Sequence, residues 1–134
     1  MKNLLFLLIF CLLFSTACEK TDKDVFFRLG SGQEFTFSDI ELYDTSTNIL
    51  YFKKEQDYLE KMYENSFAFM NNGEIIYQGS FHPGYSSSMP IGPFIWSPPA
   101  YGTYALKIEN WRNPNNSDVR KDPTLINILN QNNL

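Results

Sequence analysis

His82 is the single histidine of the chain, and it limits the catalytic chemistry that the sequence can support. A metal site built from several imidazoles is excluded, and a histidine-dependent acid–base enzyme must use this residue. The serines at 86–88 follow closely, but nucleophilic catalysis also needs a carboxylate behind the imidazole. The spacing supplies none, and the chain has no Gly-x-Ser-x-Gly motif. We expect His82 to be a loop histidine bonded to backbone, and residues 86–88 to form a turn.

Pairs of acidic side chains give no acid–base site either. Glu60 and Glu64 flank Lys61 on a predicted helix, which is the pattern of a solvated face. Hydrolysis by two carboxyl groups needs one of them in an apolar pocket that raises its pKa. Asp22 and Asp24 lack the Gly and Glu of a calcium-binding loop. We therefore predict no catalytic residue, no metal site and no cofactor.

Residues 81–102 combine aromatic side chains with many prolines and glycines. The prolines disfavour central-strand pairing outside 94–96, so we predict a surface segment. Aromatic rings are enriched at binding hot spots, and flat rings also suit the faces of sugars. In the alternative, Phe94, Trp96 and Tyr104 close the core of the domain while the prolines protect a sheet edge. The candidate binding residues are Tyr85, Trp96, Tyr101 and Trp111.

The composition of the chain narrows the class of protein. A length of 134 residues indicates one domain, since domains typically contain about 100–150 residues. A hydrophobic content of 43%, with 16% aromatic residues, disfavours disorder. Eleven basic and fifteen acidic side chains give a net charge of −4. This balance argues against the cationic surface that nucleic-acid binding needs.

The N-terminal segment has the pattern of a secretory signal. A positive charge at Lys2 precedes an unbroken apolar run at residues 4–14, and small side chains at 15–17 follow it. The apolar run is too short to span a bilayer, which takes about 20 residues. Cys18 comes directly after the small residues.

Small residues that end in Ala–Cys after an apolar run resemble the lipobox of bacterial lipoproteins, although Ser15 stands where the lipobox usually has Leu. The resemblance implies cleavage between Ala17 and Cys18, diacylation of the Cys18 sulfur and acylation of the new amino terminus. Two or more acyl chains anchor a protein stably to a membrane. The implied location is the bacterial cell envelope, on the outer membrane, in the periplasm or at the surface. The alternative is ordinary secretion with cleavage nearby.

These features predict a signal peptide at 1–17, a charged tether at 18–24 and a single β-rich domain at 25–134. Alternating apolar residues and turn signals predict strands at residues 25–29, 34–42, 49–52, 66–70, 74–77, 94–96 and 103–109. Turns at 44–48 and at 71–73 predict two hairpins, the second from its Asn–Gly pair.

Two helices are predicted beside the strands. Residues 53–64 have amphipathic helical spacing, and Asp122–Pro123 is a typical helix start. The C-terminal helix has an apolar face formed by Leu125, Ile126, Ile128 and Leu129, and residues 130–134 are expected to fray. The predicted fold is a mainly antiparallel β-sandwich of about six or seven strands, with a short mid-chain helix and a C-terminal helix on one side. The alternative is an α+β fold with a single curved sheet.

We expect a lipid-anchored, non-catalytic envelope protein whose domain binds a protein partner or serves as an accessory module. Its binding surface would be the segment 81–102. The second hypothesis is a carbohydrate-binding module that uses Trp96 and nearby tyrosines. The third is a hydrolase that acts through His82.

Replacing the acylated residue tests the membrane anchor. Cys18→Ala removes the thiol that would carry the lipid, so we expect loss of lipid labelling and of membrane association. Metabolic labelling with a clickable fatty acid, followed by membrane fractionation, measures both. An unlabelled wild-type protein would refute the prediction.

Overall fold

The structure of the protein is a computed structural model that describes residues 24–56, 65–111 and 117–134. Most of the amphipathic helix predicted at 53–64 lies outside these ranges, and residues 53–56 are not helical. None of the helices within the described ranges has the length and apolar character needed to cross a membrane.

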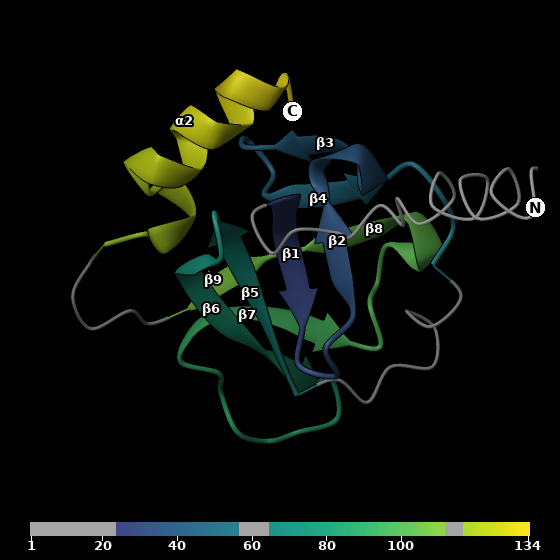
Figure 1. The fold of residues 1–134 in the computed structure, drawn as a ribbon. Coiled ribbons are helices and arrows are strands. Elements are labelled where there is room, and N and C mark those ends of the chain that lie inside the picture. The colour runs from purple at the N-terminus through teal and green to yellow at the C-terminus, as the bar shows by residue number, and fades with distance from the viewer. Residues whose placement is uncertain (1–23, 57–64, 112–116) are drawn as a thin grey trace, which may run out of the picture.

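The described residues form two β-sheets and one α-helix near the C-terminus (Figure 1). The larger sheet has six strands, in the order β2 (Glu34–Thr36), β1 (Val25–Leu29), β5 (Ser66–Asn71), β6 (Glu74–Pro83), β7 (Gly92–Ser97) and β9 (Glu109–Trp111). The smaller sheet has three strands, in the order β3 (Ile40–Asp44), β4 (Ile49–Phe52) and β8 (Ala105–Lys107). Neighbouring strands are antiparallel except β6 and β7. The predicted mainly β, sandwich-like fold is confirmed, and the alternative of a single sheet is wrong.

The strand predicted at 34–42 is divided between the two sheets. β2 joins the larger sheet and β3 the smaller one, with the 3₁₀ turn η2 (Phe37–Asp39) between them. The Thr36 N–H and hydroxyl donate to the Asp39 carboxylate at 2.8 and 2.9 Å. These local bonds compete with strand pairing and turn the chain. An irregularity between Ile40 and Leu42 in the pairing with β4 then shifts the register of β3, so the predicted alternation is wrong at Leu42, which is exposed and does not face the core.

The strand predicted at 103–109 is divided in the same way. It begins later than predicted, after the 3₁₀ turn η4 (Gly102–Tyr104). β8 pairs with β4 in the smaller sheet and β9 pairs with β7 in the larger one. Ile108 lies between β8 and β9 and is fully buried. Strands that switch sheets make the corners of such packings, so the two sheets are joined at two corners.

Both predicted hairpins are confirmed. The Asp44 carboxylate accepts hydrogen bonds from the Ser46 N–H and hydroxyl at 2.8 and 2.6 Å, which closes the turn between β3 and β4. Between β5 and β6, Asn72 and Gly73 have φ values of 50° and 83°. A two-residue turn with positive φ at both positions has the twist that a tight hairpin requires.

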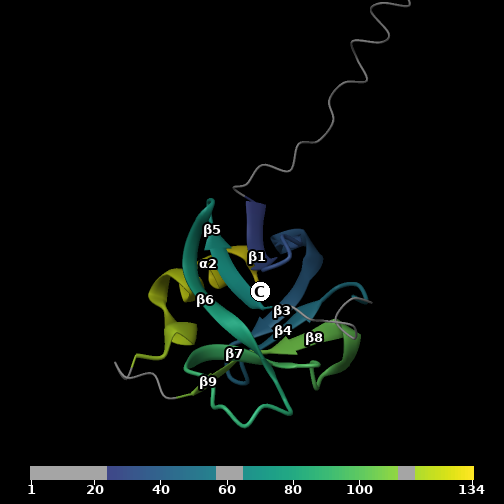
Figure 2. The same cartoon turned by 90° about the horizontal axis from the view of Figure 1, so that it is seen from below.

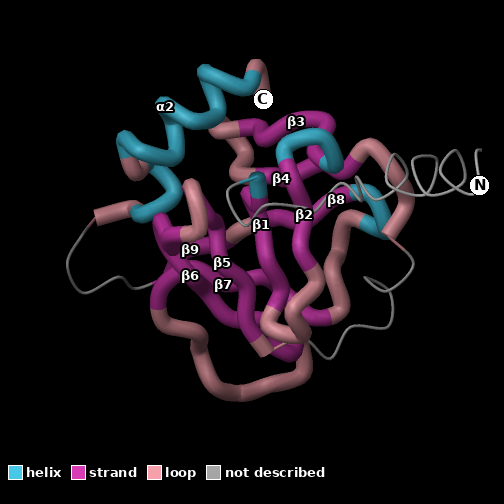
Figure 3. Tube along the Cα trace, in the orientation of Figure 1, coloured by secondary structure: helices cyan, strands magenta, loops and turns pink. Residues whose placement is uncertain are grey.

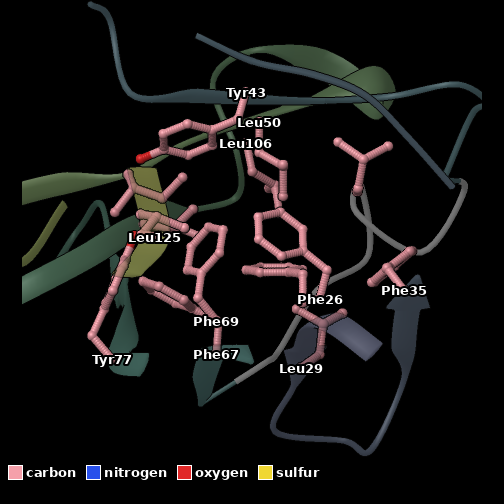
Figure 4. Close-up of a cluster of buried hydrophobic side chains, with 14 of the residues drawn as sticks. Phe26, Leu29, Phe35, Tyr43, Leu50, Phe67, Phe69, Tyr77, Leu106 and Leu125 are labelled. Carbon is pink, nitrogen blue, oxygen red and sulfur yellow. The ribbon is translucent and has the colours of Figure 1, made fainter. Parts of the chain in front are cut away.

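Aromatic rings from both sheets form the centre of the core (Figure 4). The Phe69 ring of β5 lies 5.0 Å from Phe27 of β1 and 4.9 Å from Tyr77 of β6, between ring centroids. From the smaller sheet, Tyr43 of β3 approaches the same ring edge-on at 5.7 Å. Edge-to-face and offset contacts at these distances are favourable geometries for aromatic pairs. Phe69 thus holds the two sheets together.

The C-terminal helix α2 (Pro123–Asn132) packs beside the sheets and is capped at both ends. The Asp122 carboxylate accepts from the Thr124 N–H at 2.8 Å, which confirms the predicted start. The apolar face is buried at Leu125, Ile128 and Leu129 and half-buried at Ile126. The predicted fraying of 130–134 is wrong. Asn133 adopts a left-handed conformation and the Leu134 N–H donates to Leu129 O at 3.0 Å, which closes the helix.

Gly79 of β6 provides a test of the sheet packing. A Cβ atom at this position would overlap the Phe67 ring and the Pro93 carbonyl, so Gly79→Ala should lower the free energy of unfolding by about 1–3 kcal/mol through overpacking. Urea denaturation measures this change. Gly84→Ala is the matched control, because its Cβ would meet only the Ser97 carbonyl at 4.0 Å. Equal stability of the two variants would contradict the packing described here.

Candidate functional site

Strand β7 covers more of the proline-rich segment than the sequence predicts. It extends over Gly92–Ser97 and lies between β6 and β9, although it contains Pro93. The ladder with β6 begins only at Phe94, which pairs with Ser80. Pro93 has a partner only in β9, so its missing N–H is not needed on the β6 side. This explains why a proline is tolerated in an inner strand.

Residues 84–91, here called the crossover loop, connect the parallel strands β6 and β7 (Figure 3). Parallel strands usually need a connection of about a dozen residues or more. The paired stretch runs only from Ser80↔Phe94 to Pro83↔Ser97, so a short return is enough. In Figure 1 this loop lies at the opposite end of the molecule from α2, and Figure 2 shows it projecting beyond β7.

His82 holds the crossover loop in place. Its Nε2 lies 2.8 Å from the Ser88 carbonyl oxygen, and because a carbonyl only accepts, Nε2 carries the proton. The expected backbone bond of His82 is therefore present, although the residue lies in β6 and not in a loop. Within the turn predicted at 86–88, Ser88 N–H donates to the Ser86 hydroxyl at 3.2 Å and the two hydroxyls are 2.7 Å apart. A further turn precedes it, closed by the Ser86 N–H, which donates to Pro83 O at 3.0 Å.

A second small aromatic cluster lies beneath the crossover loop, outside the main core. Phe94 is buried, and strand alternation points it away from the core side that Ile95 occupies. Its ring centroid lies 5.0 Å from Trp96 and 6.2 Å from His82. Tyr104, in contrast, is half-exposed. Core closure by Phe94, Trp96 and Tyr104, the alternative considered for this segment, is therefore not confirmed, since Phe94 is buried outside the main core, Trp96 is half-buried and Tyr104 is exposed.

The crossover loop carries large apolar side chains that are exposed to solvent. Tyr85 is 90% exposed, Ile91 76% and Met89 46%. The loop runs along β7, because Gly84 N–H donates to Ser97 O at one end and Ile91 adjoins Gly92 at the other. Met89 and Ile91 were not among the residues predicted from the sequence. The feature that could have identified them is a pair of apolar residues on either side of Pro90, in a segment that is not predicted to be buried in a strand.

Trp96 and Tyr101, two of the candidate residues, line one shallow hollow of about 110 Å³. The hollow also includes Lys107 and Glu109, whose Nζ and Oε1 atoms are 2.8 Å apart. That hydrogen bond raises the pKa of Lys107. The Lys107 ammonium lies 6.0 Å from the Tyr101 ring centroid, at the limit of a cation–π contact.

Trp111, the fourth candidate residue, lies at the other end of β7. It pairs with Gly92 and is 41% exposed, so it adjoins the Ile91 end of the crossover loop and not the hollow. The four candidate residues therefore do not line a single pocket. Trp96 and Tyr101 lie at one end of β7 and Trp111 lies at the other. The crossover loop, which carries Tyr85, runs between these two ends.

The ion pair of Asp118 and Arg120 fixes β9 and the position of Trp111. Arg120, in the 3₁₀ turn η5 (Val119–Lys121), donates Nε and Nη2 to the Asp118 carboxylate at 2.8 and 2.7 Å and Nη1 to Ile108 O at 3.0 Å. The Asn110 amide donates to Asp118 at 3.2 Å. The Arg120 hydrogen bonds lower the pKa of Asp118.

Across the part of the chain that the structure describes, no three His, Cys, Asp or Glu residues are grouped to hold a metal ion.

No family model, curated protein or solved structure matches the chain.

The Asp118–Arg120 pair predicts a specific pH dependence. Because the folded pKa of Asp118 is lowered, its stabilisation is complete above the unfolded pKa of about 3.9 and is lost as the pH falls through the folded value. Asp118→Asn should therefore be less stable than wild type at pH 7, and the difference should shrink below about pH 4. Urea denaturation followed by tryptophan fluorescence measures it. Glu41→Gln removes an exposed carboxylate from β3 and serves as the control; a constant difference for Asp118→Asn across pH would contradict the prediction.

Proposed function

We propose that the chain is a lipid-anchored protein of the bacterial cell envelope whose β-rich domain binds a protein partner and catalyses no reaction. The crossover loop and the aromatic residues at its two ends are the binding surface. The observation that carries the proposal is the strong exposure of Tyr85 and Ile91 on a loop whose backbone is already fixed. Exposed apolar side chains grouped in this way mark interaction surfaces.

The fixed shape of the crossover loop favours tight association. The His82–Ser88 bond and the buried Pro90 restrict its backbone before a partner binds. Ordering side chains at an interface costs about 0.5–1.5 kcal/mol for each flexible group, so an ordered loop loses less on binding. Aromatic residues and methionine are enriched in the centres of protein interfaces. Tyr85 and Met89 belong to these types.

A protein partner fits the exposed side chains better than a carbohydrate does. Ile91 and Met89 have neither a flat face for stacking on a sugar ring nor a group that bonds to hydroxyls. The hollow at Trp96 and Tyr101, with its charged pair, is the observation that favours carbohydrate as the second candidate. Its volume of about 110 Å³ is well below the roughly 300–1,000 Å³ of small-molecule sites.

The surroundings of His82 support a non-catalytic role. Its Nε2 proton is engaged with the Ser88 carbonyl, and its ring packs against Trp96 at 5.5 Å between centroids. Here the imidazole supports the crossover loop.

The proposed anchor restricts where a partner can be. A tether over residues 18–24 reaches at most about 25 Å when extended. A partner bound to the domain must therefore lie at or near the membrane surface that holds the acyl chains of Cys18. An accessory subunit or an inhibitor of an envelope enzyme would satisfy this geometry.

The proposal predicts that a double variant of the crossover loop loses its partner. Crosslinking in cells, with mass spectrometry of the captured proteins, identifies the partner, and titration of that purified protein measures its affinity. Tyr85→Ala with Ile91→Ala should weaken binding at least tenfold, because two exposed contact residues are removed. Leu42→Ala is the matched control, since Leu42 is an exposed aliphatic residue of the other sheet.

Unchanged affinity of the double variant would reject this surface. If no partner is captured and soluble glycans quench the tryptophan fluorescence of wild type but not of Trp96→Ala, the carbohydrate alternative replaces the protein one.

A further inference from the structure

A groove of about 430 Å³ crosses the larger sheet on strands β1, β2, β5 and β6, away from the crossover loop. Its centre is a row of residues that pair directly across these strands. Glu34 pairs with Arg28, Arg28 with Ala68, and Ala68 with Gln78. Directly paired residues point to the same face of a sheet. The small Ala68 side chain therefore forms a floor between the longer side chains of Arg28 and Gln78.

Arg28 is the chemically unusual residue of this groove. Its side chain is half-buried, yet within the described ranges the guanidinium has no hydrogen-bond or ion-pair partner. Arg120 shows the usual arrangement, with donors engaged by a carboxylate and a carbonyl. Because no described group engages this guanidinium, its five N–H donors are available to an anion that enters the groove. The planar fork of these donors matches a carboxylate in a bidentate arrangement.

Glu34 narrows the class of anion. It is the cross-strand partner of Arg28, but the two side chains form no ion pair. Its negative charge opposes a doubly charged phosphate more than a singly charged carboxylate. The same carboxylate can accept a hydrogen bond from an N–H group next to the bound anion. A peptide C-terminus has this combination, because its last residue carries both the terminal carboxylate and the N–H of the last peptide bond.

The remaining walls suit an extended peptide. Gln78 is exposed on the far side of Ala68 from Arg28, and Ser66 is exposed further along β5; they supply an amide and a hydroxyl for backbone groups. Ile75 is 49% exposed and offers an apolar contact for a side chain. The volume of about 430 Å³ lies within the range of roughly 300–1,000 Å³ for ligand sites.

We propose that this groove binds the free C-terminal carboxylate of an extended peptide, with Arg28 holding the carboxylate and Glu34 accepting the adjacent amide N–H. The site is separate from the crossover loop, so its test is independent of the function proposed above.

Fluorescein-labelled pentapeptides Gly-Ser-Ser-Ala-X, with X as Val, Leu or Phe, test the proposal in the acid and the C-terminal amide forms. Fluorescence anisotropy of each peptide is titrated with the full mature chain in detergent micelles. We expect saturable binding of at least one acid form and at least tenfold weaker binding of its amide. Arg28→Gln should abolish binding. Arg28→Lys should weaken it at least fivefold, because an ammonium keeps the charge but loses the fork.

Lys54→Gln, which removes a positive charge from an exposed side chain after β4, is the matched control and should bind as wild type does. Thermal unfolding verifies that each variant is folded, and Gln78→Ala replaces Arg28→Gln if the latter is not. Equal affinity for acid and amide, full affinity in Arg28→Lys, or no saturable binding at millimolar concentrations would overturn the proposal. Binding of inorganic phosphate or a galacturonate trisaccharide in place of the peptides would overturn it as well.

Discussion

The packing of aromatic rings around Phe69 is the interaction on which the rest of the structure depends. Rings from β1, β5 and β6 meet Tyr43 from the smaller sheet at this residue. An aromatic side chain buries about 150–250 Å², worth about 5 kcal/mol at 25 cal/mol per Å². The core also buries the hydroxyls of Tyr43 and Tyr77, which perturb each other's titration but lack hydrogen-bond geometry. Burial raises the pKa of Tyr43 to about 12 and that of Tyr77 well above 10. An orphan hydroxyl costs about 1–3 kcal/mol, less than its ring contributes.

The surfaces follow from how the sheets close around this core. Two chain segments switch between the sheets, at η2 and at Ile108, and the second places β9 beside β7. With β6 and β7 parallel, the intervening chain must return beside the sheet, and the His82–Ser88 bond fixes its path. The crossover loop therefore buries Pro90 and exposes Tyr85 and Ile91. The parallel pairing of β6 and β7 thus accounts both for the fixed backbone of the loop and for its exposed side chains.

The two arginines of the described chain show how charge is distributed between structure and surface. Arg120 is engaged by the Asp118 carboxylate and by Ile108 O, and it holds η5 next to the start of β9. Arg28 is half-buried, and no described residue engages its guanidinium in a hydrogen bond or an ion pair. A saturated guanidinium stabilises the fold, whereas an unsaturated one is available to a ligand. The crossover loop and the Arg28 groove thus offer different chemistry from one sheet.

Structural features that depend only on residues close together in the chain could be predicted from the sequence. Alternation predicted the β-rich class, Asn72–Gly73 and residues 44–48 the hairpins, and Asp122–Pro123 the start of α2, because turns and caps are encoded within a few positions. Tertiary structure alone decided which strands pair. The split at Thr36–Asp39, the parallel β6–β7 pair and the Arg28–Ala68–Gln78 row depend on residues distant in sequence, and alternation carries no information about partners. For the same reason the sequence named Tyr85, Trp96, Tyr101 and Trp111 as candidates, while only the fold showed their separation along β7.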